Sequence, residues 1–182
     1  MKNTLLVLTM TAAAVLSGMV PRAKAEDSFS FNMVRAAGAT CLASNAGGRV
    51  TVSNVGSNQH MHVEVFGLTP NNDFTLFITQ HSARPFGFSW YQGEIHTDRR
   101  GRGVGDFVGI FSGETFTLTD TNTPVQMSHV AMWFADSNDA ANAGCAAIDT
   151  PFDGDHHAGI LVLSTANFPD DQDPLQSVGQ PE

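Results

Sequence analysis

Apolar and polar residues alternate with a period of two along much of the chain, which is the pattern of β-strands that bury one face. Residues 60–66 place Met61, Val63 and Val65 on one face and polar side chains on the other. Most such runs are bounded by Gly, Pro, Asp or Asn, which favour turns. The pattern predicts strands at residues 49–55, 60–66, 73–80, 86–95, 103–111, 114–118, 127–134 and 158–164.

The connections between these runs predict an antiparallel all-β fold. Residues 67–73 are a dense cluster of turn formers between two strands, as expected for a hairpin. Only residues 136–143 have helical character, with Ser137 or Asn138 as the N-cap and Gly144 at the C-terminal end. About eight short strands and one short helix indicate an antiparallel β-sandwich of jelly-roll or Greek-key type.

The first 25 residues have the composition of a signal peptide. A lysine precedes an apolar run over residues 5–20, and Ala23 and Ala25 are the small residues that a signal peptidase accepts. The run is too short for a comfortable bilayer span, and Met19 stands where a lipoprotein would need Cys. We therefore expect cleavage before Glu26 and a secreted or periplasmic protein with no membrane insertion after cleavage.

The net charge of the chain limits the kinds of molecule that it is expected to bind. The 182-residue chain would lose its three leader basic residues on cleavage, leaving six arginines, no lysine and 18 acidic residues, a formal charge of −12. This charge disfavours nucleic acid and anionic membrane surfaces, so the expected partner is a small ligand, a glycan, a protein or a cation. The domain prediction is a signal peptide over residues 1–25, one β-sandwich domain over 26–168 and an acidic flexible tail over 169–182.

The two cysteines, Cys41 and Cys145, both lie in the exported part of the chain. An oxidising compartment would couple them, and we predict a disulfide that stabilises the fold by closing a long loop. The alternative is a pair of free thiols used as metal ligands or as a redox pair, but such sites have closer spacing.

His60, His62 and Glu64 alternate along a predicted strand, so their side chains share one face. Two imidazoles at this spacing converge on one metal ion, copper or zinc, when another histidine completes the ligand set. The candidates for that further ligand are His81, His129, His156 and His157. The alternative is a solvated strand face that carries polar residues and no metal.

A second cluster lies on a Gly-containing loop over residues 149–157, which carries Asp149, Asp153 and Asp155. Carboxylates and carbonyls on such a loop are suitable ligands for a hard cation such as calcium, although the spacing is not that of an EF-hand. The alternative is a turn in which the Asp side chains accept hydrogen bonds from backbone amides.

Aromatic residues form a third cluster. Phe86, Phe88 and Trp90 fall on one face of a predicted strand, which favours a place in the core. If the strand register instead turns Trp90 or Tyr91 outward, the ring and Gln92 would form a platform for a sugar or a peptide.

Motifs for catalysis are missing from the sequence. Ser89 lacks the Gly-x-Ser-x-Gly elbow of hydrolases, and no Gly-rich phosphate loop follows a predicted strand and opens a helix. We therefore assign no catalytic residue and expect a binding or cell-envelope module rather than an enzyme, with a metal-binding protein that uses His60 and His62 as the alternative.

Several runs resemble a family of uncharacterised secreted bacterial proteins. These runs are residues 67–71, 85–93, 143–145, 151–152 and 156–159. The resemblance implies export and a shared fold, and it brings no activity, cofactor or catalytic residue.

Overall fold

The computed structural model describes residues 28–112, 116–150 and 157–177. The strands in these ranges are β1 (Ser28–Arg35), β2 (Gly47–Val55), β3 (Asn58–Phe66), β4 (Asp73–Thr79), β5 (Ser89–His96), β6 (Gly103–Gly109), β7 (Phe116–Leu118), β8 (Pro124–Gln126), β9 (His129–Phe134) and β10 (Leu161–Ser164). The helices are α1 (Ser137–Asn142) and the short 3-10 helix η1 (Pro174–Ser177).

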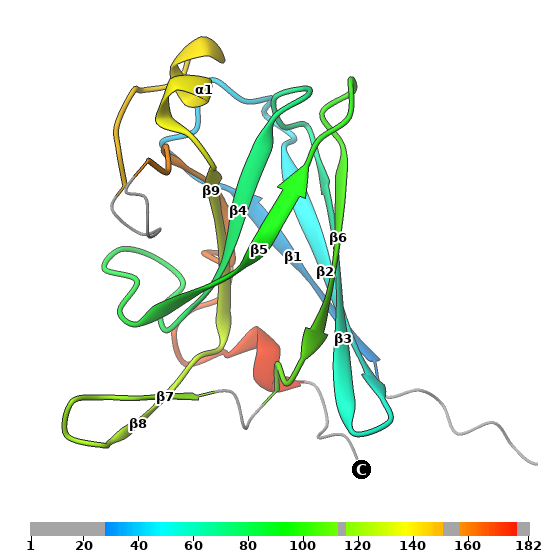
Figure 1. Ribbon diagram of the computed structural model, residues 1–182, viewed down its shortest axis with the longest axis vertical. Coiled ribbons are helices and arrows are strands. Elements are labelled where there is room, and N and C mark those ends of the chain that lie inside the picture. The colour runs from blue at the N-terminus through cyan, green and yellow to red at the C-terminus, as the bar shows by residue number, and fades with distance from the viewer. Residues whose placement is uncertain (1–27, 113–115, 151–156, 178–182) are drawn as a thin grey trace, which may run out of the picture.

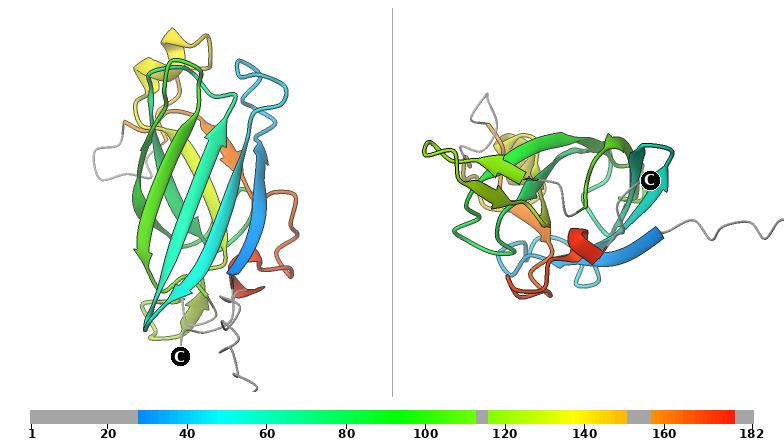
Figure 2. Two further views of the ribbon diagram at one scale, coloured as in Figure 1. Left: turned by 90° about the vertical axis from the view of Figure 1, so that its right-hand side faces the viewer. Right: turned by 90° about the horizontal axis from the view of Figure 1, so that it is seen from below.

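Eight strands form one antiparallel sheet in the order β5-β4-β9-β10-β1-β2-β3-β6. The sheet curls until its two edge strands, β5 and β6, lie side by side near the turn that joins them, where Thr97 and Gly103 form a bridge (Figure 1). Seen along the strands, the sheet wraps around a single core, and the β7–β8 hairpin projects from it (Figure 2). The predicted all-β, antiparallel class is confirmed.

The alternating pattern of β3 has the predicted consequence. Met61, Val63 and Val65 are buried in the core, and the polar side chains between them face outward. Strand β1 was missed by the sequence analysis although Phe31 and Met33 alternate in it with polar residues and are buried. The short strand β8 was missed as well.

Strands β4 and β9 are buried on both faces, unlike β3. A second apolar cluster covers their outer face and consists of Phe77, Phe86, Ala131, Trp133 and Ala158. The ring of Trp133 packs edge-to-face against Phe86 and Phe77, with centroid distances of 5.2 and 5.4 Å. Residues 80–88, between β4 and β5, therefore act as a cover for this face of the sheet.

This cover corrects the expected aromatic core stripe. Strand β5 begins at Ser89, so Phe86 and Phe88 belong to the preceding loop. Phe86 is buried in the outer cluster, Phe88 is 44% exposed, and only Trp90 packs against the main core.

The disulfide between Cys41 and Cys145 is confirmed, with a Cα–Cα distance of 5.1 Å. It joins the loop after β1 to the residues that follow α1. Arg35 orders that loop by donating hydrogen bonds to the carbonyl oxygens of Ala39 and Leu42. The N-cap of α1 is Asp136, one residue before Ser137 and two before Asn138, the predicted caps.

The chain after β10 is attached to the sheet over residues 169–177. Leu175 in η1 is fully buried, and its amide donates to the carbonyl oxygen of Ser128. Asp170 and Asp173 accept hydrogen bonds from Ser82 and Ser128. Residues 170–175 of the segment expected to be a flexible acidic tail thus contact the sheet and the loop over residues 80–88.

Candidate functional site

The register of β3 and β6 brings an acidic residue to the two predicted histidine ligands. His62 is paired with Asp106 across the strands, on the outer face of the sheet. Asp106 Oδ1 lies 2.7 Å from His62 Nδ1 and 3.0 Å from His60 Nε2. One carboxylate oxygen thus accepts from both imidazoles, which requires a proton on each of these ring nitrogens.

These contacts keep the Asp106 carboxylate ionised. They hold its pKa below the ordinary value of 3.8, and the hydrogen bond from His62 is the largest cause. The Asp106 side chain is 54% exposed, so solvent screens its charge strongly. The three side chains form a small, accessible cluster of two nitrogen donors and one oxygen donor.

The other predicted metal ligands lie elsewhere. Glu64 is on the same outer face, exposed and paired in register with Val104. His81 and His129 belong to a separate cluster, and His157 lies beside the start of α1. Within the described part of the chain, the residue that contacts both His60 and His62 is Asp106 and not a further histidine.

His156 falls outside the residues that the structure describes. Within residues 28–112, 116–150 and 157–177, no three His, Cys, Asp or Glu side chains are already spaced to hold a metal ion.

The predicted aromatic platform is divided between two faces of β5. Trp90 packs partly against the core and its indole N–H donates to Gln92 Oε1 at 3.4 Å. Tyr91 is 53% exposed on the outer face, where its ring packs edge-to-face against Phe77. Of these three residues only Tyr91 is exposed, so they do not form one platform.

The predicted calcium loop is described only at its start. Asp149 is exposed, and Asp153 and Asp155 lie outside the described residues.

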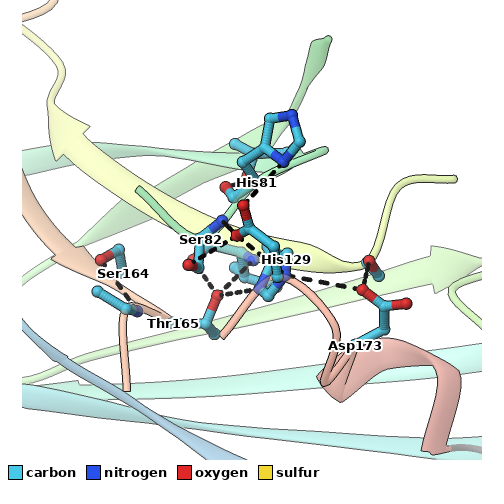
Figure 3. Close-up of polar contacts among 11 residues, drawn as sticks. His81, Ser82, His129, Ser164, Thr165 and Asp173 are labelled. Carbon is cyan, nitrogen blue, oxygen red and sulfur yellow. Dashed lines mark hydrogen bonds and ion pairs between the residues drawn. The ribbon is translucent and has the colours of Figure 1, made fainter. Parts of the chain in front are cut away.

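A buried histidine, His129, is the first residue of β9 and lies where residues 165–177 meet the sheet (Figure 3). The His129 side chain is fully buried, and its Nδ1 lies 3.1 Å from Thr165 Oγ1. Its Nε2 makes no hydrogen bond in the described part of the chain and faces Oδ1 of Asp173 at 3.7 Å and of Asp170 at 3.9 Å. Burial lowers the pKa of His129 below 6.5, against the opposing pull of the two carboxylates.

Asp170 is the residue that joins this cluster to the loop over residues 80–88. Its Oδ1 accepts from Ser82 N at 2.9 Å and Ser82 Oγ at 3.0 Å, and its Oδ2 lies 3.0 Å from His81 Nδ1. The backbone hydrogen bond from Ser82 is the main reason that the pKa of Asp170 falls below 3.8. The cluster thus holds the segment after β10 against the loop over residues 80–88. Among the described residues, its one contact between a hydroxyl and an imidazole, Thr165 with His129, is buried, whereas nucleophilic catalysis needs such a pair in an accessible cleft.

An apolar pocket of 420 Å³ lies beside β10, and neither alternation nor motifs pointed to it. Four separate segments of the chain form its walls. Its principal lining residues are Ala36, Arg84, Phe86, Ile148, Leu161 and Ser164. The volume lies in the range of about 300–1,000 Å³ that is usual for small-molecule sites.

Of the described residues that line this pocket, Arg84 is the only charged one. The sequence carried one signal for it, an isolated arginine within an aromatic and proline-containing run of an acidic chain. That signal was too weak to assign a site before the surrounding segments were placed.

A scan of protein-family models finds no match to this chain, and a search of curated proteins finds none. No helix in the described residues is long and apolar enough to cross a membrane.

Proposed function

We propose that the protein is an exported, non-enzymatic binding module whose ligand site is the apolar pocket beside β10. The observation that carries the proposal is a 420 Å³ pocket with predominantly apolar walls and only a few polar groups. Ligand sites commonly combine such walls with a small number of polar groups that orient the ligand.

The location of the pocket supports this proposal. It borders the outer apolar cluster through Phe86 and Leu161, so one wall is held by tightly packed aromatic rings. A rigid wall limits the conformational entropy that the protein loses when a ligand binds.

The Cys41–Cys145 bridge supports the exported location in this proposal, because disulfides persist in oxidising compartments.

The test is binding of Nile red, an uncharged apolar dye, to the mature protein. We expect a saturable rise in fluorescence with one site for the wild type. Ala146→Trp places an indole in the pocket from an exposed lining position and should abolish the rise. Ser57→Trp, in the exposed turn between β2 and β3, is the matched control and should bind as the wild type does.

Circular dichroism of each variant shows whether the fold is retained. Non-saturable binding by the wild type, or equal binding by the folded Ala146→Trp variant, would contradict the pocket as the ligand site.

A second candidate function is binding of zinc or copper by His60, His62 and Asp106. The observation that favours it is the convergence of both imidazoles on Asp106 Oδ1, at 3.0 and 2.7 Å. A metal ion would replace the two ring protons and separate the donors slightly, since first-row metals bind such nitrogen and oxygen donors at about 2.0–2.2 Å. Protons would be released on binding.

Calorimetric titration with zinc and with copper tests this candidate. We expect uptake of one ion by the wild type, a loss of at least tenfold in affinity in Asp106→Asn, and loss of binding in His62→Ala. His96→Ala is the matched control, because His96 is exposed and contacts a single carboxylate, Asp73, at 2.7 Å. Equal titrations for His62→Ala and His96→Ala would leave the cluster as a cross-strand hydrogen-bond pair.

A further inference from the structure

The apolar pocket adjoins a polar hollow, and the two share residues. The hollow has a volume of 400 Å³ and is lined by His81, Ser82, Ala83, Arg84, Pro85 and Asp170. Ala83 and Arg84 also line the apolar pocket. A ligand that fills the pocket therefore has a polar space beside it, with Arg84 at the boundary.

The guanidinium of Arg84 has its donors available for a ligand. It makes no salt bridge and no hydrogen bond with any residue that the structure describes. The carboxylate in the same hollow, Asp170, is already bonded through Oδ1 to Ser82 and through Oδ2 to His81. The donors of Arg84 are thus unpaired among the described residues, while both carboxylate oxygens of Asp170 already accept hydrogen bonds.

The pocket and the unpaired guanidinium together define a class of ligand. We propose that the site binds an amphiphile with a carboxylate head group, its apolar body in the pocket and its carboxylate on Arg84. This inference rests on the proposed binding function and adds the chemistry of the ligand. Arg is well suited to this role because its planar fork binds a carboxylate through two parallel hydrogen bonds.

Charge complementarity explains why Arg84 matters in this protein. The mature chain expected from the sequence carries 18 acidic residues against six arginines, so its surface repels an anion in general. A carboxylate gains from binding only where a local cation outweighs that repulsion. Among the described residues that line the apolar pocket there is no carboxylate, and Arg84 is the one that carries a charge.

Three ligands with one tail and different head groups test the inference: octanoate, octan-1-ol and octylammonium. Each is titrated at neutral pH into the mature protein loaded with Nile red, and displacement of the dye is measured. We expect octanoate to bind about tenfold more tightly than octan-1-ol, the gain typical of a charge-assisted contact. Octylammonium should bind no better than the alcohol.

Arg84→Gln should bring octanoate to the affinity of octan-1-ol and leave the alcohol unchanged. Arg99→Gln, an exposed arginine in the turn between β5 and β6, is the matched control and should keep the preference. The preference of the wild type should weaken at high salt, because an exposed ion pair is screened.

The two proposals fail in different ways. If the dye and octan-1-ol bind but octanoate gains nothing, or if the gain survives Arg84→Gln, the carboxylate inference is wrong and the binding function stands. A preference for octylammonium assigns the head group to Asp170 and likewise overturns the inference. If neither the dye nor any of the three ligands binds, the binding function fails as well.

Discussion

At the scale of single residues, His129 is a fully buried side chain whose ionisation is opposed by the fold. Burial disfavours its charged form, and the carboxylates of Asp173 and Asp170 only partly oppose this effect. The pKa of His129 in the folded protein is therefore below 6.5, the ordinary value. As pH falls below about 6.5, the unfolded chain takes up a proton first, and the folded state loses stability.

We therefore predict that the protein becomes less stable as pH falls from about 6.5 towards the lowered pKa of His129. The total loss in the free energy of unfolding is about 1.4 kcal/mol for each unit by which folding lowers that pKa. Thermal melts of the wild type and of His129→Gln, measured at about pH 7.5 and about pH 5.5, test this. The variant should show the smaller drop, and the exposed His96→Gln should behave as the wild type. Parallel curves for the wild type and His129→Gln would show that His129 has the same pKa in the folded and unfolded states, which would contradict the prediction.

At the scale of elements, two attachments hold segments that are not strands of the sheet. The disulfide ties the loop after β1 to the end of α1, across a sequence separation of 104 residues. Leu175, Asp170 and Asp173 fasten the chain after β10 to the opposite end of β9. The disulfide lies near the apolar pocket, because the turn after β1 and the segment after α1 line it. Asp170 of the second attachment lines the polar hollow beside that pocket.

Removal of the disulfide should lower stability substantially. A bridge that closes a loop of about 100 residues stabilises by ~4–5 kcal/mol on the chain-entropy model, so Cys41→Ser with Cys145→Ser should lower the thermal midpoint by roughly 10–20 °C. Reduced wild-type protein is the natural comparison and should melt with the double variant. An unchanged midpoint would show that the bridge contributes little to the free energy of unfolding.

At the scale of the whole molecule, the curled sheet is closed by side chains where β5 and β6 separate. The ring of Phe107 on β6 packs over Gly93 on β5, where an added Cβ would lie 2.5 Å from the ring. Gly105, beside Phe107 on the same inner face, likewise leaves no room for a Cβ between Phe107 and Ile95. Glycine at both positions lets one aromatic ring span the two edges.

Because the Phe107 ring contacts both edge strands, its truncation should lower the free energy of unfolding by more than is usual for a residue on an edge strand. We predict that Phe107→Ala lowers the free energy of unfolding by about 2–4 kcal/mol, since the ring is partly buried against the core. Val108→Ala is the matched control, because Val108 is 72% exposed, and it should change stability by less than about 0.5 kcal/mol. Urea titrations measure both, and equal effects would mean that the contact between β5 and β6 does not depend on the ring.

Strand β6 shows where the hydrophobic pattern of a strand fails to predict which of its faces is buried. Its valines, Val104 and Val108, are exposed, whereas Gly103, Gly105 and Phe107 face inward. Hydrophobicity alone would place the valines inside. The orientation is reversed because the inner face must accept one large ring from β6, and that requirement arises only when β5 lies opposite.

The sequence by itself determined the antiparallel β class, the buried face of β3 and the pairing of the only two cysteines, because each depends on local periodicity or on the presence of a single partner. It also placed His60 and His62 on one face. Only the tertiary structure decided that Asp106 joins them, that Phe86 covers an outer cluster and that Arg84 borders an apolar pocket. These contacts join residues far apart in the chain, and alternation specifies which face a side chain takes but not which strand or loop lies beside it.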